Sequence, residues 1–128
     1  MIAHTEILVS DYQKSKEFYT KVLKTLGYAQ NMEYGEAAGF NDGKNTDFWV
    51  SRDPQKGMAK LHVAFEAKNK DEVDAFYKAA LAQGAKDNGA PGYRTDYWPG
   101  YYAAFILDAD GHNIEAVWYD YSQVKEEK

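Results

Sequence analysis

The sequence predicts an α+β fold made of two β-α-β-β-β modules, and three observations lead to this prediction. The chain of 128 residues repeats one pattern at an offset of 58 residues, which relates His4 to His62 and Phe18 to Phe76. In each copy, apolar residues first alternate with a period of two, which is typical of a strand, and then recur every three or four residues, which is typical of a helix. Two copies indicate paired supersecondary units rather than a solenoid, which needs three or more repeats.

Each module opens with a strand whose two faces differ. Residues 3–9 and 61–67 both alternate between a mainly apolar face, which should pack on a helix, and a more polar face. His4 lies on the polar face of the first strand, and His62 lies on the polar face of the second. We therefore expect both histidines to point away from the helices.

Each opening strand leads into an amphipathic helix with recognisable ends. Ser10 or Asp11 can cap the first helix, and Asn69 followed by Glu72 resembles a capping box for the second. Both helices are expected to end at a glycine, namely Gly27 and Gly84.

Short extended segments broken by turn residues follow each helix. In the first module we expect strands near residues 28–33, 36–40 and 47–51. In the second, a strand near residues 85–87 precedes a Gly/Pro-rich loop over residues 88–100, and strands near residues 101–107 and 113–119 follow. The sequence thus predicts one domain over residues 1–123, with modules at about 1–52 and 60–121, a linker over residues 51–60 and a frayed tail at 124–128.

Composition excludes several classes of function. The absence of cysteine excludes a disulfide scaffold, a thiolate zinc site, an iron–sulfur cluster and a cysteine nucleophile. A net charge of −5 without a basic cluster argues against nucleic acid and membrane surfaces as partners. The sequence shows neither an apolar run long enough to span a bilayer nor a signal peptide, so we expect a cytoplasmic protein.

Three side chains form a candidate metal site. Glu115 lies within a β-branched and aromatic segment, where a buried carboxylate is costly unless it is paired or binds an ion. With His4 and His62 it makes a set of two histidines and one carboxylate, which suits a divalent first-row metal and leaves positions open for substrate. Such a centre would act as a Lewis acid on an anionic, bidentate oxygen ligand. The competing interpretation is that these are ordinary core or surface residues. For the third histidine, His112, which lies in a predicted turn, we prefer this ordinary interpretation.

Asp47 is a possible fourth ligand. Residues 42–47 resemble residues 110–115, so a fully symmetric repeat would place Asp47 opposite Glu115 as a ligand or a general base. A competing alignment places Phe48 or Trp49 there, and a ring would then cover the site.

The ending Asp-x-Asp-Gly-x-x-Ile-Glu at residues 108–115, after two such repeats, resembles the vicinal oxygen chelate superfamily. This is the glyoxalase/bleomycin resistance protein/extradiol dioxygenase family, and the resemblance extends from Ile2 to about Asp120. It implies that the two modules pair into an open, cup-shaped mixed sheet with a metal inside. In similar members the ligands map onto a histidine of each first strand and a glutamate of the last strand, which here are His4, His62 and Glu115.

The resemblance implies a metal-dependent lyase, isomerase or dioxygenase, in which Zn, Ni, Mn or Fe chelates vicinal oxygens of a small metabolite. A lactoylglutathione-lyase-like activity is one such reaction, and a homodimer is expected. The alternative is a metal-free, bleomycin-resistance-type protein that binds a drug or metabolite. Around the site we expect substrate contacts from residues with aromatic rings or a guanidinium, and Tyr102 as a catalytic hydrogen-bond donor. The expected substrate-binding residues are Trp49, Arg94, Trp98 and Tyr101.

Overall fold

A computed structural model describes residues 2–53 and 59–124 of the chain. The first module contains β1 (Thr5–Val9), α1 (Tyr12–Leu23), a 3₁₀ turn (Lys24–Leu26), β2 (Ala29–Tyr34), β3 (Ala37–Asn41) and β4 (Thr46–Arg52). The second contains β5 (His62–Glu66), α2 (Lys70–Ala82), β6 (Lys86–Tyr93), β7 (Tyr101–Leu107) and β8 (Asn113–Tyr119), followed by a 3₁₀ turn (Tyr121–Gln123). Parts of the predicted linker and tail lie outside the described residues.

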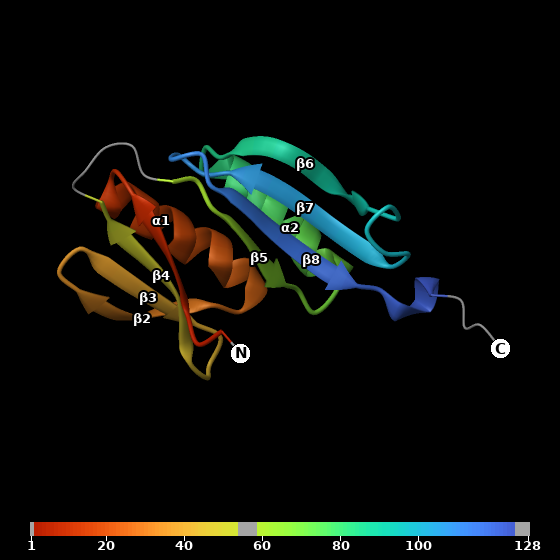
Figure 1. Cartoon of the computed structure of the whole chain (residues 1–128), viewed down its shortest axis with the longest axis horizontal. Helices are drawn as coiled ribbons and strands as arrows, with labels where there is room; N and C mark the ends of the chain where they lie inside the picture. Colours follow the sequence, from red (N-terminus) through yellow and green to blue (C-terminus); the bar gives the residue numbers. More distant parts are fainter. Residues whose placement is uncertain (1, 54–58, 125–128) are drawn as a thin grey trace.

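Each module forms its own four-stranded mixed sheet, and the two sheets have the same topology. The strand orders are β1-β4-β3-β2 and β5-β8-β7-β6. In both, the opening strand pairs in parallel with the last strand of its module, and the other pairs are antiparallel. The two modules lie side by side along the long axis of the molecule (Figure 1). The α+β fold of two β-α-β-β-β modules is therefore confirmed.

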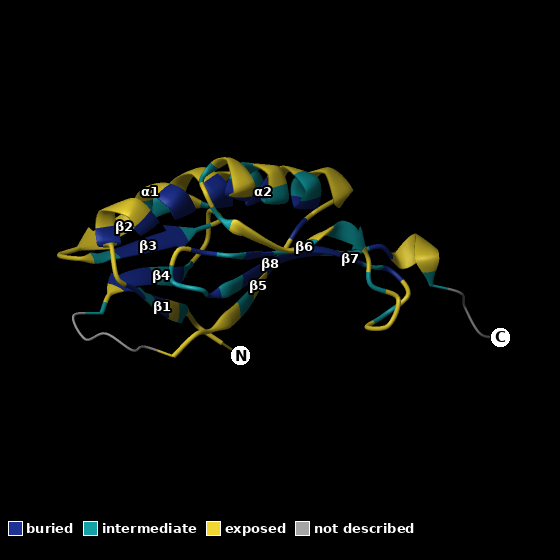
Figure 2. Ribbon diagram, turned by 90° about the horizontal axis from the view of Figure 1, so that it is seen from above, coloured by how far each residue is buried: buried dark blue, intermediate teal, exposed yellow. Residues whose placement is uncertain are grey.

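Both helices cover the same side of the two sheets and leave the other side uncovered (Figure 2). The core lies between helices and sheets, where Tyr19 and Phe76 of the helices meet Ile7, Phe48 and Ile114 of the strands. Because side chains alternate along a strand, residues next to these core positions point to the helix-free face. That face is where the sequence placed the histidines. None of the helices in the described part of the chain is long and apolar enough to cross a bilayer.

The helix caps follow the predicted chemistry. The Asp11 carboxylate accepts a hydrogen bond from the Lys14 backbone N–H at 3.2 Å, and the Asn69 side chain accepts one from the Glu72 N–H at 2.8 Å. The return bond of the second cap differs from a capping box, because the Glu72 carboxylate accepts from the Lys68 N–H. These bonds satisfy N–H groups that the first helical turn leaves without partners.

Strand β6 is the main departure from the sequence-based prediction. The stretch with Gly89, Pro91 and Gly92, expected to be a loop, continues the strand to Tyr93 and pairs with β7. β6 is an edge strand, where a proline without an N–H is tolerated, and its pairing shifts register between Asp87 and Gly89 and again between Gly89 and Gly92. Gly and Pro here mark bulges of an edge strand rather than the end of the sheet.

Buried polar contacts hold the modules together. His112 is fully buried, and its Nε2–H donates to the Leu8 carbonyl at 2.7 Å while its Nδ1 accepts from the Leu61 N–H at 3.0 Å. The Tyr19 hydroxyl donates to the Asp108 carboxylate at 2.6 Å. The His112–Leu8 and Tyr19–Asp108 bonds cross from the second module to the first and fix how the two sheets sit against each other.

Candidate functional site

His62 and Glu115 lie together on the helix-free face of the second sheet. Parallel pairing of β5 and β8 sets Ala64 opposite Glu115 and His62 opposite Asn113, so the two side chains are diagonal neighbours. The His62 Nε2 atom lies 2.8 Å from a carboxylate oxygen of Glu115. Glu115 is only 1% exposed, whereas the His62 side chain is 53% exposed. The pair thus joins a buried carboxylate to an open imidazole.

Tyr101 of β7 holds the second oxygen of Glu115. Its hydroxyl donates a hydrogen bond to that oxygen across the β7–β8 pair. Burial, together with this bond and the charge of Glu115, raises the pKa of Tyr101 well above its usual range. The phenol therefore stays a neutral donor at physiological pH and orients the carboxylate.

The donor geometry of His62 and Glu115 fits two ligands of one metal ion. Two bonds of about 2.0–2.2 Å that meet at about 90° on a shared ion place their donor atoms roughly 3 Å apart, close to the separation of 2.8 Å. The hydrogen bond from Tyr101 provides the outer-shell support that ligating carboxylates usually have. Within the described residues, no group of three or more His, Cys, Asp or Glu side chains gathers around one point. One chain therefore contributes two of the three predicted ligands to this place.

His4 lies apart from His62 and Glu115 in the structure. It is exposed and lines a cavity of about 230 Å³ between the modules, together with Asp47, Tyr28 and Glu66. His62 lines a different cavity, of about 300 Å³.

Asp47 occupies a bulge of β4 rather than a regular position of the sheet. Asn41 pairs with Thr46 and Phe40 with Phe48, so Asp47 is the extra residue. One carboxylate oxygen accepts from the Tyr28 hydroxyl at 3.2 Å, and the other is buried without a hydrogen-bond partner. Burial is the main cause that raises the pKa of Asp47 above its ordinary value.

The strand registers identify Trp49 as the counterpart of Glu115. Glu6 pairs with Trp49 in the first module, and Ala64, which is 58 residues further on, pairs with Glu115 in the second. This agrees with the competing alignment, in which a ring takes the place of the acid. Trp49 stacks on Tyr34, with ring centroids 6.2 Å apart, and does not line the cavity of His62.

A row of aromatic rings borders Glu115 on the helix-free face. Tyr97 and Tyr119 both meet Tyr101 edge to face, at 5.2 Å and 5.6 Å between centroids, and Trp98 meets Tyr119 at 5.9 Å. Two of the predicted substrate-binding residues, Trp98 and Tyr101, thus belong to one aromatic wall beside the pair.

Tyr102 lies on the opposite face of β7. Its hydroxyl donates to Asp74 of α2 at 2.5 Å, and burial followed by this bond raises its pKa above the usual range. Since neighbouring residues of a strand face opposite ways, Tyr101 and Tyr102 cannot both reach Glu115. The structure therefore does not bring Tyr102, predicted as a catalytic donor, to the site.

Arg94, the fourth predicted substrate-binding residue, shares the cavity of His62. Phe105, Asn88 and Asn113 line the same cavity but are not among the residues that the sequence singled out. Strand alternation could have found Phe105 and Asn113, because they share a face with Tyr101 and Glu115 respectively. Asn88 lies in the bulged part of β6, which the sequence presented as a loop, and therefore had no such signal.

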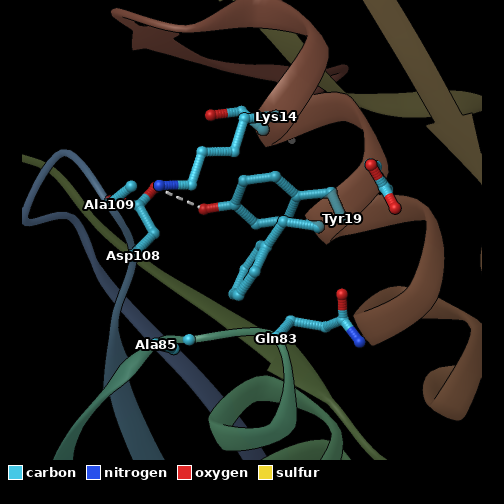
Figure 3. Close-up of a pocket in the computed structure, with 10 residues that line it drawn as sticks. Lys14, Tyr19, Gln83, Ala85, Asp108 and Ala109 are labelled. Atoms are coloured by element: carbon cyan, nitrogen blue, oxygen red, sulfur yellow. Dashed lines mark hydrogen bonds between the residues drawn. The ribbon is translucent and has the colours of Figure 1, made fainter.

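A separate cavity of about 180 Å³ opens on the helix side between α1, the end of α2 and the β7–β8 turn (Figure 3). Its polar centre is the Tyr19–Asp108 hydrogen bond, which Figure 3 shows as a dashed line. The backbone N–H groups of Asp110 and His112 also donate to Asp108, so both oxygens of its carboxylate accept hydrogen bonds. This cavity marks a junction between the modules.

Comparison with known proteins places the chain in a family. The family model of the glyoxalase/bleomycin resistance protein/dioxygenase superfamily matches residues 1–116. The chain belongs to this superfamily.

The chain matches its relatives over nearly their whole length. It is 27% identical to the uncharacterized protein YqjT of Bacillus subtilis strain 168, over 89% of this chain and 95% of that protein. It resembles the crystal structure of a glyoxalase/bleomycin resistance protein from Albidiferax ferrireducens T118, with 26% identity, a TM-score of 0.79 and coverage of 92% and 98%. A lactoylglutathione lyase structure from Agrobacterium tumefaciens, at 18% identity, has a TM-score of 0.68 and 92% coverage of both chains, and it shows the shared fold.

Proposed function

We propose that this chain is a metal-dependent enzyme of the vicinal oxygen chelate type that acts on a small oxygen-bearing metabolite. The observation that supports this proposal is the pair of His62 and Glu115. A carboxylate that is 1% exposed would be costly to keep charged in an apolar strand, yet it lies beside an open imidazole at the edge of a cavity. Such an arrangement is useful to an enzyme that must bind an ion and leave it accessible.

We propose that His4 of a second copy completes the site. His4 of the same chain lines another cavity, so a complete set of two histidines and one carboxylate requires a different source of the second imidazole. A twofold dimer provides it, because each copy then offers its first module to the second module of its partner and two equal sites result. Trp49 belongs to the same module as His4 and would bring an aromatic surface to the site.

A divalent ion, of which Zn, Ni, Mn and Fe are the candidates, would supply a Lewis acid that stabilises negative charge on substrate oxygens. Lyase, isomerase and dioxygenase reactions of this type share that requirement. The residues of this chain would have distinct tasks around it. Tyr101 keeps the Glu115 carboxylate oriented, Trp98 and Tyr101 belong to the aromatic wall beside the pair, and Arg94 faces the same cavity as His62. The role of Asp47 as a ligand or base stays a prediction.

Metal titration of protein stripped with a chelator tests the proposal. Calorimetry with Zn²⁺, Ni²⁺, Mn²⁺ and Fe²⁺ should find about one ion per chain for at least one metal, with affinity at least 100-fold weaker in His62→Ala and in Glu115→Gln. Glu66→Gln, which removes an exposed carboxylate from the same strand as His62, is the matched control and should keep the affinity.

Two results would refute this function. One is wild-type protein that binds none of the four metals, and the other is binding that both variants retain. The first result would leave the metal-free, bleomycin-resistance-type binding protein as the better interpretation.

A further inference from the structure

We infer that Arg94 forms an oxyanion-binding subsite beside the His62–Glu115 pair, so that the substrate is a small molecule with a carboxylate or phosphate-type group. This inference deepens the proposed function and rests on it for the identity of the reaction site. It depends on how the guanidinium is held, on what surrounds it and on its position relative to His62.

The Arg94 guanidinium is fixed by the strand that precedes it, β6. Nη1 donates to the Gly92 carbonyl at 2.8 Å and Nη2 donates to the Ala90 carbonyl at 2.7 Å, while the group lies over the Phe105 ring at 5.4 Å from the centroid. These two bonds use two of about five N–H groups of an arginine side chain. The remaining donors are held in a rigid fork, which suits bidentate recognition of a planar or tetrahedral oxyanion.

Two glycines make room for this guanidinium. A Cβ atom on Gly89 would lie 3.0 Å from Nη2 of Arg94 and 3.0 Å from the Phe105 ring, and one on Gly92 would lie 3.1 Å from Nη1. Gly89 also has a φ of +146°, a conformation that other residues rarely adopt. The bulges that interrupt β6 at these glycines therefore leave the space that the arginine side chain occupies.

No carboxylate neutralises Arg94 within the part of the chain that the structure describes. The ion pairs found there do not involve Arg94, and the cavity that it lines with His62 contains no acidic side chain. Glu115 contacts His62 but does not line this cavity, so the Arg94 guanidinium is the charged group that a ligand in the cavity would meet. The missing counter-charge is the feature that points to an anionic ligand.

The other polar groups of this cavity also suit an anion. The Asn88 amide donates to the side-chain oxygen of Asn113 at 3.2 Å, which leaves the Asn113 amide N–H₂ as a donor toward the cavity. Phe105 lies between the two functional groups, since its ring is 6.3 Å from the His62 ring and also carries the Arg94 guanidinium. A small ligand can therefore place its oxyanion on Arg94 and its reacting oxygens near His62.

Nuclear magnetic resonance can observe this subsite directly, because the chain has two arginines, Arg52 and Arg94. We would titrate metal-free, ¹⁵N-labelled protein with inorganic phosphate, with acetate and with trimethylammonium, and follow both arginine Nε–H signals. Arg94 should shift saturably with phosphate, acetate or both, whereas Arg52, which pairs with exposed Glu36, should not saturate. The first two probes identify the preferred oxyanion, and trimethylammonium should not displace either one.

Matched variants separate the guanidinium from general charge. Arg94→Gln should weaken anion binding about 10-fold or more, Arg94→Lys should fall between it and the wild type, and Gly92→Ala should weaken binding by crowding Nη1. Arg52→Gln removes the same charge from another surface and should leave the affinity unchanged.

The outcomes are distinct from those of the metal titration. Loss of anion binding in Arg94→Gln with wild-type metal affinity is the result that we expect. No saturable anion binding, equal affinity in Arg94→Gln, or a preference for trimethylammonium would each overturn the subsite, even if the metal binds as proposed. Anion binding without metal binding would instead refute the metal-dependent function and keep the subsite.

Discussion

The two modules have the same topology but use the helix-free face of their sheets differently. In the second module, Glu115 stands beside His62 within hydrogen-bond distance. In the first, the corresponding strand position holds Trp49, whose ring stacks on Tyr34. The acid of the first module, Asp47, occupies a bulge and contacts Tyr28. The comparison teaches that a repeated backbone does not require a repeated site.

The replacement of Glu115 by Trp49 in the first module is accompanied by a difference in the neighbouring strand. Gly39 is the pairing partner of Trp49 in the first sheet, and Phe105 is the pairing partner of Glu115 in the second. A large ring beside a glycine in one module thus corresponds to a carboxylate beside a phenylalanine in the other. Only the second arrangement places a carboxylate next to a histidine.

The largest expected effect comes from breaking the junction that couples the modules. His112→Ala removes a buried ring and leaves the Leu8 carbonyl and the Leu61 N–H without their partner, so we expect a loss of about 3 kcal/mol in the free energy of unfolding. Urea denaturation measures this loss. Measured in metal-free protein, His4→Ala, on an exposed residue, is the control and should change stability by less than about 0.5 kcal/mol. Equal effects of the two substitutions would show that the junction is unimportant.

Gly39→Ala tests the ring arrangement of the first module. The new Cβ atom would lie 2.6 Å from Thr46 Cγ2 and 2.9 Å from the Trp49 ring, so the tryptophan must move. We expect a loss of about 2 kcal/mol in the free energy of unfolding, together with a change in tryptophan fluorescence. Gly35→Ala adds a methyl group where there is open space, so it controls for added volume. Its φ of +55° carries a backbone cost, which we expect to be smaller than the cost of the clash at Gly39. Unchanged stability and fluorescence in Gly39→Ala would contradict close packing at Trp49.

Tyr101→Phe tests the support of the acid in the second module. Without the hydroxyl, one Glu115 oxygen loses its donor, so we expect metal affinity to fall about 10-fold while the metal stoichiometry stays the same. Tyr97→Phe keeps the aromatic wall and removes an exposed hydroxyl, so it should behave as wild type. Calorimetric titration compares the two variants, and identical affinities would argue against Tyr101 as the residue that orients Glu115.

Asp47→Asn makes the first module more like the second, where Asn113 occupies the corresponding position. Because burial raises the pKa of folded Asp47 above its ordinary 3.8, the folded chain loses stability as pH rises through that range. The substitution should therefore stabilise the protein by about 1 kcal/mol or less at pH 7 and by little near pH 3. Chemical denaturation at both values measures this, and an equal gain at both would show that the charge of Asp47 is not the cause.

The repeat predicted most of this fold because hydrophobic periodicity survives in both copies. It predicted that both histidines point away from the helices, and the structure places His62 beside Glu115 on the helix-free face. The sequence could not reveal the extra residue at Asp47, since a bulge depends on how two strands pair and not on one strand alone. It also left Gly89 to Tyr93 as a loop, because Gly and Pro have the same local signal in a turn and in a bulged edge strand.

Contacts between distant segments were the least predictable. His112 looked like an ordinary turn residue, and its role as the buried link between modules depends on Leu8, about a hundred positions earlier in the chain. Likewise, the position of the Arg94 guanidinium depends on the pairing of the bulged β6 with β7, which carries Phe105.

The most direct test of the central claim is a mixing experiment with two inactive half-sites. His4→Ala and His62→Ala proteins are unfolded together in equal amounts, refolded, and measured for bound metal. If each site takes His62 and Glu115 from one copy and His4 from its partner, mixed dimers contain one intact site, and about a quarter of wild-type metal binding returns. Each variant refolded alone should bind none tightly. No recovery in the mixture, with wild-type protein that regains its metal after the same treatment, would contradict a site shared between two copies.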